Sequence, residues 1–221
     1  MPKRLWYDFL HVFCRLLATL FMQVRVSGRE FMPREGGVLV LSNHQSFYDP
    51  VLIGLACDRR LNFLARDGLF GFAPFRWLIQ SLDAIPIDQQ GSALAGLKET
   101  LRRLKRGEPV LIFPEGMRTF DGEVAPLKPG FCTLAKRAAV PLLPVAMEGA
   151  YEAWPRWRLL PGLCTIHIQF GDPISPETAA AYDERQLLEE VERRIRECHR
   201  QVRLSRDRST CGWRARQEDE G

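Results

Sequence analysis

Residues 38–50 read VLVLSNHQSFYDP, a short apolar run followed at once by polar residues. The apolar run predicts a buried strand, and side chains just past a strand of an α/β sheet meet ligands at its carboxyl end. His44 and Asp49 both lie in this polar stretch. Imidazole can remove a hydroxyl proton near neutral pH, and a carboxylate on its other ring nitrogen would fix the tautomer. The stretch therefore predicts a general base, His44, oriented by Asp49.

A purely structural interpretation of the same residues stays open. Asp49 precedes Pro50, so it would be a good N-cap for a helix beginning there, and Asn43 and Ser46 would make turn hydrogen bonds. His44 would then be incidental. Because residues five apart are not neighbours on one helix, the catalytic interpretation requires a bent loop between His44 and Asp49.

A second apolar run ending in polar residues, VLIFPEGMRT, spans residues 110–119. Together with the first segment, it resembles the two most diagnostic blocks of the glycerolipid acyltransferases, the family of the bacterial 1-acyl-glycerol-3-phosphate (lysophosphatidic acid) acyltransferases. The resemblance continues in AIPIDQ at 84–89 and in VPLLPVAMEG at 140–149. The positions that match the two blocks are Asn43, His44 and Asp49 in the first and Phe113, Pro114, Glu115, Gly116 and Arg118 in the second. Four ordered blocks are far more specific than one short match.

The resemblance implies roles for these residues. His44 would act as general base on the acceptor hydroxyl, which attacks a thioester without a covalent acyl-enzyme. Arg118 would bind the acceptor phosphate, a role suited to a planar guanidinium, unless it only pairs with Glu115 or Asp121 at the surface. Glu115 would help to position the glycerol, or simply hold Arg118. Gly116 and Thr119 complete the predicted substrate-binding block.

Gln89 departs from the family pattern, which usually has Arg at this place. A neutral amide can donate to a phosphate oxygen but contributes no charge, and a neutral hydrogen bond is worth about 0.5–1.5 kcal/mol against about 1.5–3 for a charged one. Lys128, in the stretch PLKPG, or Arg66 could supply the missing charge. A different head group on the acceptor is the alternative.

The pattern of apolar runs predicts one α/β domain, with helices flanking a central sheet, over residues 28–203. The resemblance implies that this central sheet is mixed. We expect a helix over 92–106 that ends at Gly107, and another carrying Leu187, Leu188, Val191 and Ile195. From residue 204 to 221 the chain is polar and is predicted to be a flexible tail. The strands are expected near 38–42, 61–65, 84–87, 110–113, 140–146 and 164–170.

Residues 1–27 are predicted to form an amphipathic helical segment preceding this domain. Apolar side chains from Trp6 to Val24 share one face, while Asp8 and Arg15 interrupt the apolar run, which favours lying in a membrane interface over crossing the bilayer. Basic residues in the segment favour the anionic cytoplasmic face of the cell membrane, where the protein would be peripheral or monotopic. The alternative is a helix that packs on the domain.

The cysteine content and the net charge bear on whether the protein binds a metal, another cofactor or a nucleic acid. The six cysteines form no CxxC pair or ligand cluster, so they indicate reduced thiols in the cytosol, and neither a metal nor another cofactor is predicted. The net charge of +4 is modest and no nucleic-acid motif is present, so we expect no nucleic-acid partner.

The sequence thus predicts an acyltransferase of phospholipid biosynthesis at a membrane lipid surface. It would move a fatty acyl group from acyl-CoA or acyl carrier protein to the free hydroxyl of 1-acyl-glycerol-3-phosphate, giving phosphatidic acid. Acylation of glycerol 3-phosphate or another lysolipid is the alternative within this class. A catalytically silent lipid-binding protein is the alternative from a different class.

Overall fold

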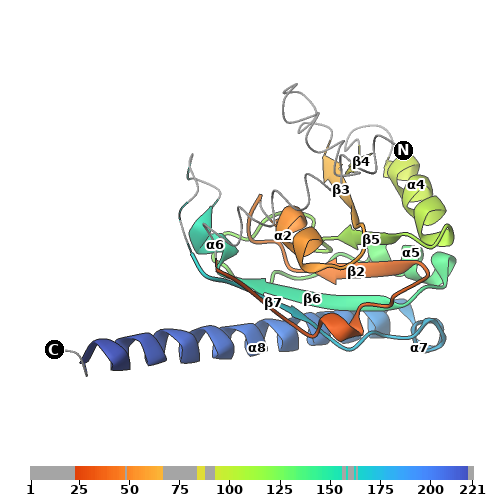
Figure 1. Ribbon diagram of the computed structural model, residues 1–221. Coiled ribbons are helices and arrows are strands. Elements are labelled where there is room, and N and C mark those ends of the chain that lie inside the picture. Colours follow the sequence, from red (N-terminus) through yellow and green to blue (C-terminus); the bar gives the residue numbers. More distant parts are fainter. Residues whose placement is uncertain are drawn as a thin grey trace.

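A seven-stranded mixed sheet forms the centre of the computed structural model, which describes residues 23–47, 49–66, 84–87, 93–155, 158, 162 and 164–218 (Figure 1). The strand order is β1-β7-β6-β2-β5-β3-β4. Every neighbouring pair is parallel except β6 and β7, which are antiparallel. The sheet is therefore mixed, as the sequence predicts. The strands are β1 (Val24–Ser27), β2 (Val38–Ser42), β3 (Asn62–Arg66), β4 (Ala84–Ile87), β5 (Pro109–Ile112), β6 (Leu142–Glu148) and β7 (Ile166–Phe170).

Helices cover both faces of this sheet (Figure 1). Helix α2 packs on one face, and α4, α5, α7 and α8 bury side chains in the apolar cluster of the other face. The helical elements are η1 (Arg29–Phe31), α2 (Asp49–Ala56), α4 (Ala93–Lys105), α5 (Gly130–Ala138), α6 (Ala150–Ala153), α7 (Pro176–Ala181) and α8 (Glu184–Glu218). The predicted α/β architecture with helices against a central sheet is confirmed.

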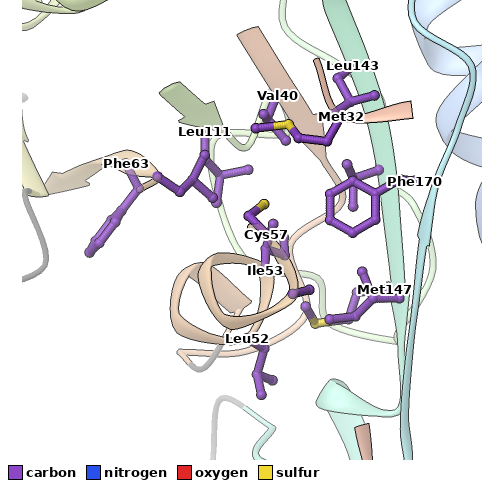
Figure 2. Packing of buried hydrophobic residues seen from close by; sticks show 14 of the residues in the cluster. Met32, Val40, Leu52, Ile53, Cys57, Phe63, Leu111, Leu143, Met147 and Phe170 are labelled. Carbon is purple, nitrogen blue, oxygen red and sulfur yellow. The ribbon is translucent and has the colours of Figure 1, made fainter. Parts of the chain in front are cut away.

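Strand β2 lies in the middle of the sheet, and all five of its residues are buried. Val38 and Val40 join the cluster on the α2 side, whereas Leu39 and Leu41 join the cluster on the opposite side. Figure 2 shows Val40 among side chains from several strands, with Ile53 of α2 facing them. Burial on both faces explains why the run is apolar throughout instead of alternating.

The helix expected over residues 92–106 is present as α4, Ala93–Lys105. Gly107 follows it with φ +84°, a conformation that glycine adopts without steric cost. Its N–H donates to Leu104 O at 3.0 Å, and the next N–H, of Glu108, donates to Arg103 O at 3.0 Å. Gly107 thus ends the helix as predicted, and the chain turns directly into β5.

The segment predicted to be helical as far as residue 27 ends in a strand instead. Val24–Ser27 form β1, which pairs in parallel with β7 at the edge of the sheet. Val24 and Val26 pack against the core on the α2 side, while the intervening residue is polar. This alternation suits a half-buried strand, and the apolar face that predicts the helix reaches only as far as Val24. Residues 1–22, which carry the rest of the predicted segment, lie outside the described residues.

Helix α8 carries the predicted apolar stripe, with Leu187, Val191 and Ile195 all buried. It continues to Glu218, well past residue 204, where the sequence predicts the start of a loose tail. Arg203 and Arg206, near this boundary, form ion pairs with carboxylates of the domain. These ion pairs hold the helix against the domain as far as residue 206, and the hydropathy pattern alone could not indicate them.

Candidate active site

Strand β2 delivers the polar loop to the carboxyl edge of the sheet from a rigid starting point. The amide of Asn43, directly after the strand, clamps the main chain of Met147 in β6: Nδ2 donates to Met147 O at 3.0 Å, and Oδ1 accepts from Met147 N at 2.9 Å. Asn43 is fully buried. Its side chain therefore fixes the position from which His44 leaves the sheet.

His44 and Asp49 lie side by side across a bent loop. Nδ1 of His44 is 2.7 Å from Oδ2 of Asp49, which is the first residue of α2 and is fully buried. The same oxygen accepts hydrogen bonds from the main-chain N–H groups of Gln45 at 2.5 Å and Ser46 at 2.8 Å. The Asp49 carboxylate is thus turned back toward the loop, so that it holds both the imidazole and the main chain beside it.

The contact with Asp49 sets the chemistry of the imidazole. When Nδ1–H donates to the carboxylate, Nε2 carries the lone pair and can accept a proton. The ring stacks on Phe113 at a centroid distance of 4.0 Å and an interplanar angle of 16°. One fifth of the His44 side chain remains exposed. The arrangement is that of a general base with a fixed tautomer, a fixed ring plane and access to solvent.

Glu115 joins the two polar loops that the sequence singled out. Its Oε1 accepts from the main-chain N–H of His44 at 2.9 Å, and its Oε2 accepts from Ala125 N at 3.3 Å. Thr119 N donates in turn to His44 O at 2.8 Å, so the loop after β5 holds His44 on both sides of its Cα. Burial raises the pKa of Glu115 to about 7, although both main-chain hydrogen bonds act in the opposite direction.

Two cations lie in the loop after β5. The Arg118 guanidinium lies over the ring of Phe47, with Cζ 3.5 Å from the ring centroid, and so reaches the loop that carries His44. Gly116, with φ +75°, leaves room for the side chain of Lys128, because an added Cβ there would lie 2.8 Å from Lys128 Nζ. The structure therefore places Lys128 beside Gly116, which precedes Arg118 by two residues.

The hydroxyl of Thr119 forms hydrogen bonds within its own loop and so stabilises the conformation of this loop. Its hydroxyl donates to Asp121 Oδ1 at 2.8 Å and accepts from Gly122 N at 3.2 Å. Thr119 is buried, as is Glu115. Both residues hold the loop in the conformation that presents Arg118.

Gln89 lies outside the described residues, so the departure from the family pattern at this position stays a sequence observation. Arg66, offered as another source of charge, is the last residue of β3.

Several polar residues of the site were not singled out from the sequence. Gln45 hydrogen-bonds through its side chain to Glu148, 103 residues away, and Glu148 in turn contacts His199 in α8. Gln45 and Glu148 stand inside two of the matched blocks, which was the only signal that could have drawn attention to them. The position of His199 carried no such signal.

Two kinds of feature are absent from the part of the chain that the structure describes. No group of three or more His, Cys, Asp or Glu side chains there could hold a metal ion. No helix there combines the length and the apolar character needed to cross a bilayer.

Comparison with known proteins gives consistent results. A family model described as Acyltransferase matches residues 23–148, which include the loop of His44 and the loop of Arg118. The protein named 1-acyl-sn-glycerol-3-phosphate acyltransferase from Pseudomonas aeruginosa is 33% identical over 179 residues, 78% of this chain and 66% of that protein. A chloroplastic protein of the same name from Brassica napus, BAT2, is 29% identical over 66% of this chain. This match spans 44% of the plant protein's length.

The fold is also similar to a solved structure. The crystal structure of the 1-acyl-sn-glycerophosphate (LPA) acyltransferase PlsC from Thermotoga maritima superimposes with a TM-score of 0.76 at 27% identity, covering 89% of this chain and 79% of that one. The family match extends over more than half of the chain and includes both polar loops of the candidate site. The chain therefore belongs to the acyltransferase family.

Proposed function

We propose that the protein transfers a fatty acyl group from a thioester donor to the free hydroxyl of 1-acyl-glycerol-3-phosphate, giving phosphatidic acid. The observation that carries the proposal is the 2.7 Å contact between His44 Nδ1 and the buried carboxylate of Asp49. It leaves Nε2 as the proton acceptor of a partly exposed imidazole. The names of the relatives from Pseudomonas aeruginosa, Brassica napus and Thermotoga maritima support the same substrate class.

The chemistry follows from this geometry. Nε2 of His44 accepts the proton of the acceptor hydroxyl as its oxygen attacks the thioester carbonyl carbon. Asp49 stabilises the imidazolium that forms. The carbon–sulfur bond then breaks, and the departing thiolate takes the proton from the imidazolium. One ester and one thiol result, with no covalent acyl-enzyme and no cofactor besides the donor, which we propose to be acyl-CoA or acyl carrier protein.

We assign binding of the acceptor phosphate to Arg118, with Lys128 as the second cation. Arg118 can grip two phosphate oxygens through its planar fork, whereas the Lys128 ammonium beside Gly116 acts as a point charge. The acceptor hydroxyl would then be presented to His44 in the neighbouring loop. Glu115 and Thr119 contribute by holding this loop, and Gln89 donates to the phosphate as a neutral group.

We place the protein at the cytoplasmic face of the cell membrane. The amphipathic pattern of residues 1–22 supports this position. Apolar side chains also stand exposed in the two loops of the site: Phe47 is 40%, Met117 44% and Phe120 65% exposed. A lysophospholipid lying in the same interface would reach His44 without leaving it completely.

Purified protein incubated with acyl-CoA or acyl carrier protein and a panel of acceptors tests the proposal, with products identified by mass spectrometry. We expect phosphatidic acid from 1-acyl-glycerol-3-phosphate, and none with His44→Ala. Arg185→Ala, which removes an exposed arginine paired with Glu189, is the matched control and should retain full activity. If product forms only from glycerol 3-phosphate or another lysolipid, the proposed acceptor is wrong. If lipid binds but no acyl group is transferred, the protein is a catalytically silent lipid-binding protein.

A further inference from the structure

The side chain of Gln45 joins all three loops that build the site. Gln45 follows His44 directly and is 1% exposed. Its Nε2 donates to Gly122 O at 2.9 Å in the loop after β5 and to Glu148 Oε2 at 3.0 Å at the end of β6. Its Oε1 accepts from Tyr151 N at 3.3 Å in α6. Both donors and the acceptor of one amide are therefore used, each toward a different segment.

Gln45 is also connected to both functional groups of the site. Its main-chain N–H donates to Asp49 Oδ2, the same oxygen that holds His44 Nδ1. Gly122, which its side chain contacts, hydrogen-bonds to Thr119 next to Arg118. A displacement of Gln45 would therefore move the base and the loop of the guanidinium relative to each other.

Helix α8 holds the far side of this arrangement. His199 Nε2 is 2.8 Å from Glu148 Oε2, the oxygen that also contacts Gln45, and both His199 and Glu148 are buried. Arg206, one further α8 residue, donates to the other oxygen at 3.0 Å. Burial opposes the charge of Glu148, but the hydrogen bonds from His199 and Gln45, together with the charges of His199 and Arg203, lower the pKa of this carboxyl.

We propose that Gln45 is a positioning residue for His44, and that the Glu148–His199 contact makes helix α8 part of this support. The proposal rests on the proposed function, because it deepens the account of the same site. A network of buried, fully bonded polar groups defines one arrangement of the loops and excludes nearby ones. In an enzyme of this kind, a displacement of about 1 Å at the base can lower turnover by roughly a hundredfold.

Two sets of variants separate positioning from general stability. Gln45→Met keeps the length of the side chain and removes its three hydrogen bonds, and we expect kcat to fall roughly 10- to 100-fold with little change in the KM of the thioester donor. His199→Leu should lower kcat in the same way. His199→Gln, which keeps a donor toward Glu148, should restore most of it. Cys198→Ala is the matched control, because Cys198 is buried on the same turn of α8 and packs toward Gly171.

A measurement that needs no substrate keeps this test independent of the proposed function. The low-field proton resonance of the His44 imidazole, assigned by its loss in His44→Ala, reports the contact with Asp49. We expect Gln45→Met and His199→Leu to shift or broaden it, and His199→Gln and Cys198→Ala to leave it unchanged. An unchanged resonance in the first two, or equal losses in His199→Leu and Cys198→Ala, would overturn the positioning role. Absence of acyl transfer by the wild-type protein would instead overturn the proposed function.

Discussion

Asp49→Asn separates catalysis from helix capping, because Asn and Asp are about equally good N-caps. If Asp49 only capped α2, the variant would be close to neutral in both stability and activity. In the structure, however, three hydrogen bonds converge on Oδ2: from His44 Nδ1 at 2.7 Å, Gln45 N at 2.5 Å and Ser46 N at 2.8 Å. The substitution replaces a charged acceptor by a neutral one for all three donors.

The expected magnitude follows from these contacts. To keep the two main-chain hydrogen bonds, the Asn oxygen must take the place of Oδ2. Its NH₂ group then takes the place of Oδ1, which is buried and has no hydrogen-bond partner in the described structure. An unsatisfied buried donor costs about 1–3 kcal/mol of stability. The imidazolium loses its counter-charge as well, so we expect kcat to fall roughly 10²- to 10⁴-fold, the usual range for an oriented general base.

The assay is the production of phosphatidic acid by purified protein at saturating donor and acceptor, alongside denaturant unfolding of the same samples. His44→Ala sets the lower limit, and the double variant should be no slower than His44→Ala, because both residues act on one step. Turnover within about threefold of wild type in Asp49→Asn would refute the reasoning, since a neutral acceptor would then serve as well as the carboxylate.

Four further predictions concern other parts of the chain. Removing the Arg118 charge, worth about 1.5–3 kcal/mol in a charged hydrogen bond, should lower kcat/KM for 1-acyl-glycerol-3-phosphate roughly 10- to 100-fold in Arg118→Ala, with the donor KM unchanged. Conversely, Gln89→Arg adds a positive charge and should raise kcat/KM for 1-acyl-glycerol-3-phosphate. Lower activity in Gln89→Arg would contradict an acceptor that carries a phosphate monoester. Because the pKa of Glu115 is raised from 4.5 to about 7, the folded protein holds this proton more tightly than the unfolded chain. The Glu115 contribution to the free energy of unfolding should then decrease by up to about 3 kcal/mol as pH rises through this interval, measured against Glu115→Gln by denaturant titration; a pH-independent difference would contradict it. Deleting residues 1–22, which leaves β1 intact, should release the protein from anionic vesicles in co-sedimentation, and undiminished binding would assign the membrane contact to the exposed loops of the site.

The sequence analysis predicted correctly those helices and strands whose formation depends on hydrophobic patterns within a few residues. The apolar run of β2 and the helix α4, expected over residues 92–106, can be recognised within short stretches of sequence, and the glycine that ends α4 stands in the expected place. The strand β1 was missed because four alternating residues at a sheet edge are too short to override a longer helical pattern. The contact between His44 and Asp49 was predicted correctly, because both residues lie in one block that resembles the family and are only five positions apart.

The long-range hydrogen bonds that hold the loops of the site could not be predicted from local sequence patterns. Gln45 and Glu148 are 103 residues apart, and Glu148 and His199 are 51 apart. No periodicity links such positions, because their contact depends on the order of strands in the sheet and on where α8 crosses it. The same holds for Glu115, whose bond to the main chain of His44 spans 71 residues.

The order of the strands has a consequence for how the protein acquires its site. Strands β2, β5 and β6 are neighbours in the sheet, yet long stretches of chain separate them, and each contributes one of the loops around His44. Closing such long loops costs entropy before any contact is gained, which makes parallel sheets of this kind slow to fold. His44 and Asp49 can meet early, because they are only five positions apart in the sequence, but the groups that hold them arrive with the completed sheet. We therefore expect the complete arrangement of the site to be among the last features that the folding chain acquires.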